Sequence, residues 1–189
     1  MEDIILVGFG GHAKSVADCI ERCGKYKIVG YTDSEERKSK YAYLGSDEVL
    51  SEYIKKGFCN VVICIGYLGK GTLREKLYSS LKEQGFSFPT IIDPSAIISE
   101  SASIGEGTFV GKNAVINCDV EVGKMCIINT AAIIEHESCV GDFSHISVGT
   151  VLCGQVKVGK ATFVGANATV IQCQTVDERK IVPAGVTVR

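Results

Sequence analysis

Residues 128–146 read Ile-Asn-Thr-Ala-Ala-Ile-Ile-Glu-His-Glu-Ser-Cys-Val-Gly-Asp-Phe-Ser-His-Ile, with an aliphatic residue at every sixth position. The same rhythm continues without insertion through fifteen successive positions from Ile98 to Val182. A period of six fits neither an α-helix nor an alternating strand, but it is typical of a triangular coil in which every short strand ends in a turn. The second half of the chain is therefore predicted to form an all-β left-handed parallel β-helix, with the aliphatic residues pointing inward.

Residues at fixed offsets from the aliphatic positions support this interpretation. Two places earlier, the residue is small or β-branched, as at Ala132, Ser138 and Ser144. One place later, glycine recurs six times, at Gly105, Gly111, Gly123, Gly141, Gly159 and Gly165. Because glycine tolerates backbone angles that other residues avoid, these glycines are expected to mark the tight corners of the coil.

The first half of the chain has a different pattern. Continuous apolar runs, such as Ile4-Ile5-Leu6-Val7, are typical of buried parallel strands, and segments with helical periodicity alternate with them. The expected order β-α-β-α-β-α-β predicts an α/β Rossmann-like domain over residues 1–94, with its last strand near 88–94. The β-helix domain is then expected to cover residues 95–189.

Composition narrows the class of protein. The formal net charge of −2 gives no reason to expect nucleic acid as a partner, and no apolar run approaches the roughly 20 residues of a membrane span. The nine cysteines are odd in number and include no Cys-x-x-Cys pair. This usage favours a reducing cytoplasm over a disulfide framework or a structural zinc site. We expect a cytoplasmic protein with no membrane insertion.

A glycine-rich turn, Gly8-Phe9-Gly10-Gly11-His12, follows the first expected strand and opens a helix. Turns of this kind let backbone N–H groups meet a phosphate at a helix N-terminus. Asp33 ends the second strand about twenty residues further on, where an acid can bond a ribose hydroxyl. Because the α/β segment has about half the length of a dinucleotide fold, a mononucleotide or nucleotide-sugar site is favoured over NAD. The alternative is a turn that only packs the helix against the strand.

The chain has three histidines, His12, His136 and His145. His136 lies two places after an inward aliphatic residue, so it should project from the coil with Glu135 and Glu137 on either side. A neutral imidazole can remove a proton from an amine or hydroxyl nucleophile, and a carboxylate on its other nitrogen would fix the tautomer. The pattern therefore favours His136 as a general base over an inert surface histidine, while either glutamate could be its partner.

Four segments together resemble the bacterial NeuD/PglD family of hexapeptide-repeat sugar acetyltransferases. They are Gly8-Phe9-Gly10-Gly11-His12-Ala13-Lys14, Tyr31-Thr32-Asp33, Ile134-Glu135-His136-Glu137 and Gly141-Asp142-Phe143-Ser144-His145-Ile146-Ser147. The resemblance covers nearly the whole chain. It implies an acetyl-CoA-dependent N-acetyltransferase that acts on a nucleotide-linked amino sugar of the UDP-4-amino-4,6-dideoxy type, in a homotrimer with its active sites between adjacent coils.

The resemblance also assigns roles to individual residues. His136 would be the general base, and Glu137 would raise its basicity. The predicted acetyl-CoA contacts are His145, Gly154, Ala166 and Ala184. The predicted nucleotide-sugar contacts are Gly10, Gly11, His12, Asp33, Ser34, Gly66 and Asn129. No metal is expected, and acetyl-CoA is the only expected co-substrate.

Other functions stay open at this point. Sialic acid O-acetyltransferases belong to the same family, so the acceptor could be a hydroxyl. A non-catalytic nucleotide-binding module and a metallo-hydratase are further alternatives, although His12 lies outside the coil and the usual metal-ligand spacing is missing. The turn Gly66-Tyr67-Leu68-Gly69-Lys70 departs from the Gly-x-Gly-Asn-Asn that family members often carry, which leaves the contacts of this turn with the base or phosphate open.

Overall fold

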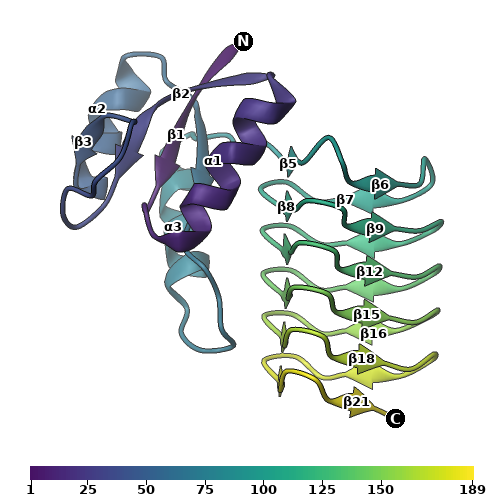
Figure 1. Cartoon of the computed structure of the whole chain (residues 1–189). Helices are drawn as coiled ribbons and strands as arrows, with labels where there is room; N and C mark the ends of the chain where they lie inside the picture. The colour runs from purple at the N-terminus through teal and green to yellow at the C-terminus, as the bar shows by residue number, and fades with distance from the viewer. The chain divides into compact units, whose positions relative to one another are not determined.

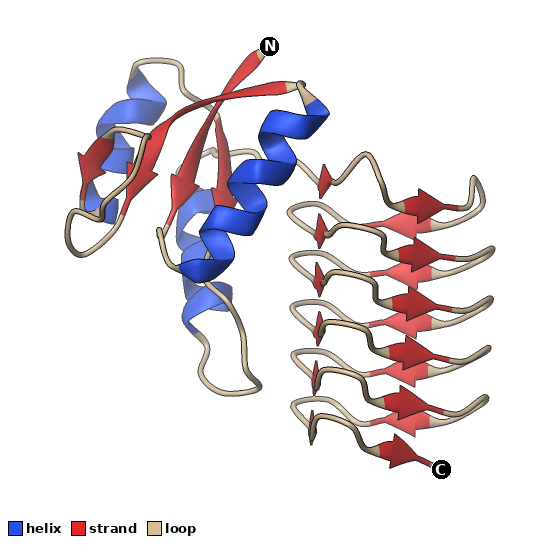
Figure 2. Cartoon of the chain, in the orientation of Figure 1, coloured by secondary structure: helices blue, strands red, loops and turns tan.

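The computed structural model describes residues 1–189, which divide into two compact units (Figure 1). Unit 1 comprises residues 1–66 and 72–89, and unit 2 comprises residues 67–71 and 90–189. Figure 2 shows that the helices belong to unit 1, whereas unit 2 is built from short strands and turns. None of the helices is both long and apolar enough to cross a membrane.

Unit 1 is a parallel sheet with strand order β3-β2-β1-β4, flanked by helices. Its elements in chain order are β1 (Glu2–Val7), α1 (Gly11–Cys23), β2 (Tyr26–Thr32), β3 (Tyr43–Gly45), the short 3-10 helix η1 (Asp47–Val49), α2 (Leu50–Lys55), β4 (Asn60–Ile63) and α3 (Leu73–Glu83). The apolar run Ile4–Val7 of β1 is fully buried. The predicted α/β unit with a parallel sheet is confirmed.

Two details of unit 1 differ from the sequence prediction. The edge strand β3 was not predicted, because three residues are too few to show a period. The strand expected near residues 88–94 does not join this sheet. It forms β5 (Ile91–Ile92), which pairs with β8 of the coil, where the Ile91 N–H donates to the Thr108 carbonyl at 3.0 Å.

Unit 2 is a β-helix whose three faces are parallel sheets. One sheet contains β5, β8 (Phe109–Val110), β11 (Ile127–Ile128), β14 (His145–Ile146), β17 (Phe163–Val164) and β20 (Ile181–Val182). The second contains β6 (Ile97–Ile98), β9 (Val115–Ile116), β12 (Ile133–Ile134), β15 (Val151–Leu152), β18 (Thr169–Val170) and β21 (Thr187–Val188). The third contains β7 (Ser103–Ile104), β10 (Glu121–Val122), β13 (Cys139–Val140), β16 (Lys157–Val158) and β19 (Thr175–Val176).

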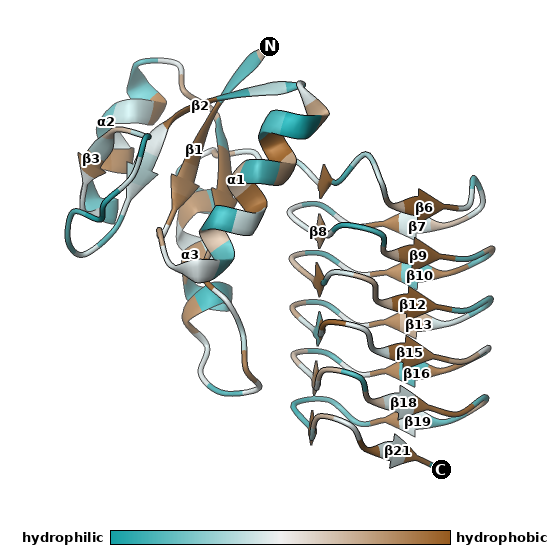
Figure 3. Ribbon diagram, viewed as in Figure 1, coloured by the Kyte–Doolittle hydropathy of each residue, from teal (hydrophilic) through white to brown (hydrophobic).

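The register of these sheets explains the six-residue period. Ile133 pairs with Val151, which lies 18 residues further along the chain, so three hexads complete one coil. The second residue of each strand points inward, and the resulting core runs from Val110 to Val182 with members no more than 6% exposed. Figure 3 shows these strands as mostly hydrophobic. Burying each aliphatic side chain contributes about 1.5–3 kcal/mol, so the repeat itself stabilises the coil.

The six glycines that follow inward aliphatic residues have a different role from the one expected. None of them has a positive φ. Instead, a Cβ atom on Gly141 would lie 2.6 Å from the backbone nitrogen of Lys160 and 2.8 Å from the carbonyl carbon of Gly159 in the next coil. The expectation that these glycines adopt unusual backbone angles is therefore wrong. They are glycine because successive coils approach closely at these positions.

The left-handed backbone conformation occurs two places after these glycine positions, at residues that are mostly not glycine. Glu137, Phe143 and Gln155 have φ values of 58°, 61° and 61°. This conformation costs a non-glycine residue about 1–2 kcal/mol. The coil offsets the cost because these N–H groups donate to carbonyls of the preceding coil, as from Glu137 to Cys118 at 3.1 Å and from Gln155 to His136 at 2.9 Å.

Small hydroxyl residues are buried on the inner side of the corners and donate hydrogen bonds to backbone carbonyls there. Ser138 and Ser144 are fully buried. The Ser138 hydroxyl donates to the Cys153 carbonyl at 3.0 Å, and the Ser144 hydroxyl donates to the Gly159 carbonyl at 2.8 Å. Because burying a hydroxyl without a partner is unfavourable, these bonds explain why serine and threonine are accepted beside an apolar core.

Candidate active site

His136 lies at the corner that follows β12, and its partner is Glu137. The Nδ1 atom of His136 is 3.1 Å from Oε2 of Glu137, and the two side chains are 50% and 54% exposed. The other flanking acid, Glu135, instead accepts a hydrogen bond from the Asn117 amide at 2.8 Å. Of the two glutamates left open by the sequence, Glu137 is the one in contact with the imidazole.

This contact determines which ring nitrogen of His136 can act as a base. A carboxylate only accepts hydrogen bonds, so in the neutral ring the proton lies on Nδ1 and the lone pair lies on Nε2. Hydrogen bonds from Gln155 and then from His136 lower the pKa of the Glu137 carboxyl, which keeps it charged at neutral pH. The pair is arranged to accept a proton at Nε2.

The backbone positions predicted to contact acetyl-CoA also lie at corners of the coil. Gly154 follows β15, Ala166 follows β17 and Ala184 follows β20, in each case two places after the inward residue. No hydrogen bond of the coil uses the N–H groups of these three residues. Each N–H is therefore available to a ligand, and the predicted contacts of these residues with acetyl-CoA stay predictions.

His145 is the outward residue of β14, yet it is only 6% exposed. Its Nδ1 atom is 2.6 Å from the Tyr67 carbonyl oxygen, and its Nε2 atom is 3.1 Å from the Asn129 side-chain nitrogen. The Thr130 N–H donates to Asn129 Oδ1 at 2.8 Å, which orients the amide. Protein groups thus engage both ring nitrogens of His145. Its predicted contact with acetyl-CoA, and that of Asn129 with the sugar, stay predictions.

The turn that departs from the family pattern belongs to the coil. The Tyr67 hydroxyl donates to the Ala161 carbonyl at 2.6 Å, and Tyr67 is only 7% exposed. Gly69 has a φ of +81°, and a Cβ atom there would lie 3.1 Å from Cβ of Phe163. These contacts place residues 67–71 against the outer face of β17. Gly66, predicted to contact the nucleotide sugar, precedes this turn and lies in unit 1.

In unit 1 the glycine-rich turn connects β1 to α1. Gly8 has a φ of +86°, and a Cβ atom there would lie 2.9 Å from the Ile65 side chain, so glycine is needed at this point. Gly10 is the N-cap of α1, and no side chain caps the helix. A Cβ atom on Gly10 or Gly11 would meet nothing within 4 Å, whereas one on Gly66 would lie 4.0 Å from Cβ of His12. The helix N-terminus is therefore open to a ligand.

Asp33 follows β2 and supports this turn from the neighbouring strand. Its Oδ2 atom accepts a hydrogen bond from the Phe9 N–H at 2.9 Å, and its Oδ1 atom accepts one from the Ser34 N–H at 2.7 Å. Burial alone would raise the pKa of the Asp33 carboxyl, but these bonds and the Arg37 guanidinium outweigh burial and lower the pKa. Asp33 therefore carries a negative charge that already has partners within the protein.

Basic side chains line the space beside the turn, and sequence analysis did not identify them. A hollow of about 360 Å³ is bordered by the turn and by Lys14, Arg37 and Lys38. The Tyr31 hydroxyl holds the backbone of Arg37, donating to its carbonyl at 2.8 Å and accepting from its N–H at 2.7 Å. The signal that could have revealed Arg37 and Lys38 is the run of charged residues from Glu35 to Lys38.

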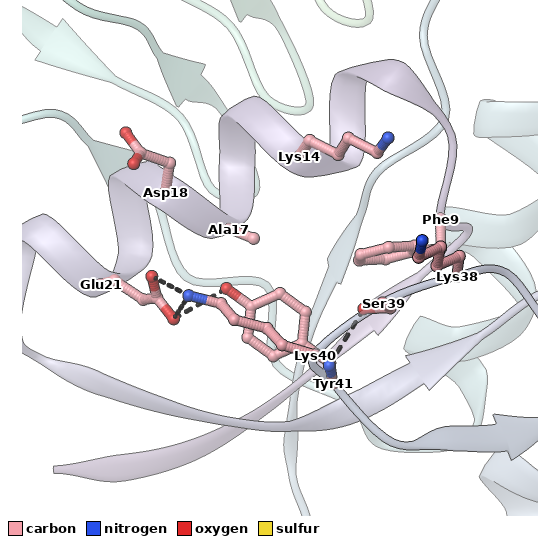
Figure 4. A pocket seen from close by; sticks show the side chains of 9 residues that line it. All are labelled: Phe9, Lys14, Ala17, Asp18, Glu21, Lys38, Ser39, Lys40 and Tyr41. Atoms are coloured by element: carbon pink, nitrogen blue, oxygen red, sulfur yellow. Dashed lines mark hydrogen bonds and ion pairs between the residues drawn. The ribbon is translucent and has the colours of Figure 1, made fainter.

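A second pocket, of about 290 Å³, lies along α1 (Figure 4). Figure 4 shows one end closed by Glu21, whose carboxylate accepts hydrogen bonds from Lys40 and from the Tyr41 hydroxyl, both at 2.8 Å. Lys14 stands at the other end, toward the glycine-rich turn. The two pockets share Lys14, Lys38 and Phe9, so the hollow beside the turn continues along the helix, where Asp18 and Glu21 add acidic groups to its lining.

The chain contains no cluster of three or more His, Cys, Asp or Glu side chains that could hold a metal ion. All nine cysteines are free thiols. Burial raises the pKa of the Cys64 thiol to about 12, which makes it unreactive at neutral pH. Cys64 therefore acts as a small core residue.

Two comparisons bear on the family. A model of the PglD N-terminal domain matches residues 3–81. The crystal structure of PerB from Caulobacter crescentus, in complex with CoA and GDP-perosamine, has a TM-score of 0.94 and 32% sequence identity, and the match covers 100% of this chain and 89% of that one. The chain belongs to the PglD family.

Two other relatives match this chain, one over its whole length and one over part of it. The acetyltransferase domain of PglB from Neisseria gonorrhoeae FA1090 has a TM-score of 0.93 at 27% identity, with coverage of 100% of this chain and 92% of that chain. UDP-N-acetylbacillosamine N-acetyltransferase from Bacillus subtilis (strain 168) is 33% identical over 113 residues, which are 58% of this chain. The match spans 51% of the Bacillus subtilis protein. The predicted resemblance to the PglD family is confirmed.

Proposed function

We propose that this protein is an acetyl-CoA-dependent N-acetyltransferase whose acceptor is the amine of a nucleotide-linked amino sugar. The observation that carries the proposal is the contact between His136 Nδ1 and Glu137 Oε2, which leaves Nε2 as the basic atom at a corner of the coil. Membership of the PglD family supports the same reaction. PerB was crystallised with CoA and GDP-perosamine, and we propose ligands of the same two classes here.

In the proposed reaction, the amine nitrogen attacks the carbonyl carbon of the thioester directly. A C–N bond forms, and Nε2 of His136 takes the proton that the amine releases. The tetrahedral intermediate then collapses, the C–S bond breaks, and the CoA thiolate takes the proton from His136. A backbone N–H at a corner of the coil would stabilise the oxyanion. No covalent acyl-enzyme is needed.

The nucleotide part of the acceptor would bind at the glycine-rich turn of unit 1. The open N-terminus of α1 and the basic side chains of Lys14, Arg37 and Lys38 favour a diphosphate there. Asp33 and Ser34 would border the same nucleotide. We propose an amino-sugar acceptor rather than a free sialic acid because this chain keeps a basic, uncapped turn that a sugar without phosphates would not use.

We also propose that the protein acts as a homotrimer in the cytoplasm. The outer face of the sheet that contains β6 is apolar, with Ile97 67% exposed and Val115, Ile133 and Val151 partly exposed. Such a row favours packing against a second coil. The nine free thiols fit a reducing compartment. Size determination by analytical ultracentrifugation would test the trimer.

The function is tested by following acetyl-CoA consumption with a panel of UDP-, GDP- and CMP-linked amino sugars and with free sialic acid. We expect turnover with a nucleotide amino sugar, and loss of at least about 100-fold in kcat for His136→Ala. CoA binding by that variant, measured calorimetrically, should persist. Near-normal turnover by His136→Ala would refute the assignment of the base, and turnover with sialic acid alone would make the acceptor a hydroxyl. Propionyl-CoA tests the length of the acyl donor.

A further inference from the structure

Three residues at one corner of the coil form a stacked column. Glu137, Gln155 and Cys173 are separated by 18 residues each, so they occupy the same place in successive coils. All three adopt the left-handed conformation, with φ values of 58°, 61° and 63°. Because the backbone conformation is the same, the three side chains leave the corner in the same direction and lie one above the other.

Hydrogen bonds connect this column to His136. The Cys173 thiol donates to Oε1 of Gln155 at 3.3 Å, and Nε2 of Gln155 donates to Oε2 of Glu137 at 3.1 Å. The same Oε2 atom is 3.1 Å from Nδ1 of His136. A carboxylate oxygen has two lone pairs, so it accepts from the amide and from the imidazole together. Because the carboxylate only accepts, the Gln155 amide turns its nitrogen toward Glu137, which leaves its oxygen to accept from the thiol.

This arrangement matters because the His136–Glu137 pair is half exposed. A surface carboxylate held by one neighbour keeps much of its rotamer freedom, and ordering it costs entropy. The bond from Gln155, which belongs to the next coil, holds the same oxygen. A backbone bond from the Gln155 N–H to the His136 carbonyl, at 2.9 Å, holds the two corners in register.

The identity of residue 155 also calls for an explanation. Residues with this conformation at other corners range from Asn113 and Asn167 to Met125 and Arg179, so the backbone conformation alone does not select residue 155. Glutamine reaches one methylene further than asparagine, which brings its amide to the carboxylate of Glu137. Gln155 and Glu137 also line a shared groove of about 360 Å³.

We propose that Gln155 is a positioning residue that holds Glu137, and through it the His136 imidazole, in the orientation needed for proton removal, with Cys173 as the second partner of its amide. This inference rests on the proposed function of His136. Gln155 itself does not touch the reacting atoms. Its effect should therefore fall on kcat, with the KM for the nucleotide sugar nearly unchanged.

Two variants of Gln155 test the proposal. Gln155→Leu keeps the size and removes the hydrogen bond, and kcat should fall about tenfold, which corresponds to the loss of one orienting bond. Gln155→Glu adds a second carboxylate near the imidazole, which should move the acid limb of the kcat/KM profile to higher pH by roughly half a unit. The matched control is Asn113→Leu, which has the same backbone conformation at a different corner and should keep native values.

The outcomes distinguish a failure of the positioning role from a failure of the proposed function. If Gln155→Leu keeps kcat within twofold of the native enzyme and Gln155→Glu leaves the acid limb in place, the positioning role is overturned. Gln155→Glu is nearly isosteric, but an ionised carboxylate only accepts and cannot donate to Glu137. A kcat for this variant within twofold of the native enzyme therefore overturns the positioning role even if the leucine variant unfolds in a thermal melt. If His136→Ala is fully active, the proposed function fails first. If His136→Ala is inactive and Gln155 variants behave like Asn113→Leu, only the positioning role fails.

Discussion

The imidazole of His136 occupies the space that a side chain at position 154 would need. A Cβ atom on Gly154 would lie 2.6 Å from Nε2 of His136 and 2.7 Å from its Cε1. Because Ile134 pairs with Leu152, His136 and Gly154 lie at the same place in neighbouring coils. The glycine thus gives the ring the room to lie across the next corner, with its Nε2 atom beside Gly154.

Gly154→Ala should therefore displace the imidazole without unfolding the coil. The backbone of Gly154 has no positive φ, and the nearest atoms belong to the far end of an exposed side chain, which can move away. We expect kcat/KM to fall by about 100-fold, since small misplacements of a catalytic group cost this much. Thermal melting should stay within a few degrees of native. The double variant with His136→Ala should lose no more activity than His136→Ala alone, and a further drop would contradict the explanation.

Gly141→Ala should lower the stability of the coil, which Gly154→Ala should leave nearly unchanged. A Cβ atom there meets the backbone of Lys160 and Gly159 in the next coil, and backbone cannot move aside as a side chain can. The coils must separate locally, at a cost of about 2 kcal/mol in the free energy of unfolding. Urea unfolding measures this cost, with Gly154→Ala as the matched glycine control. Equal stability of the two variants would show that close approach of the coils is not what requires glycine at 141.

These glycines show where sequence reasoning succeeds and where it stops. The β-helix could be predicted because its inward residues recur at a fixed spacing that the coil geometry requires. The role of Gly141 could not, because a corner glycine with a special φ and one pressed against a neighbouring coil look the same in sequence. Strand β3 could not be predicted either, because it is a short edge strand without an apolar period.

Some features of the candidate site could likewise be predicted from the sequence, and others could not. His136 and its acidic neighbours could be identified because they are adjacent in the chain. The choice between Glu135 and Glu137, and the contact of Glu137 with Gln155, depend on the 18-residue stacking and on side-chain direction. The attachment of residues 67–71 to the coil depends on Tyr67, whose partners lie 78 and 94 residues further along the chain. Contacts of that range leave no local pattern.

Tyr67→Phe should loosen this turn. The hydroxyl donates to a carbonyl at 2.6 Å, and the residue is nearly buried, so its removal leaves the Ala161 carbonyl short of a partner. We expect a loss of about 1–2 kcal/mol in stability. Limited proteolysis should also cut residues 66–71 faster than in the native protein. Tyr53→Phe, at a partly exposed position in α2, is the control and should change neither. Unchanged proteolysis of Tyr67→Phe would mean that the hydroxyl bond to the Ala161 carbonyl does not hold the turn.

Asp33→Asn should destabilise unit 1 in a way that depends on pH. The folded-state pKa of Asp33 is lowered from the ordinary value of 3.8, so its stabilising effect is fully present above that value and is lost as the pH falls through the lower, folded-state pKa. At pH 7 the variant should be less stable by about 1 kcal/mol, because a charge-assisted bond to the Phe9 N–H becomes a neutral one. Thermal melts of both proteins from pH 7 to pH 3 should show the gap narrowing below about pH 4. Ser34→Ala, which removes a 3.1 Å hydroxyl donor to the same carboxylate, should show a smaller change with the same trend. A gap that stays constant down to pH 3 would mean that the carboxylate stabilises the turn through its shape and not through its charge.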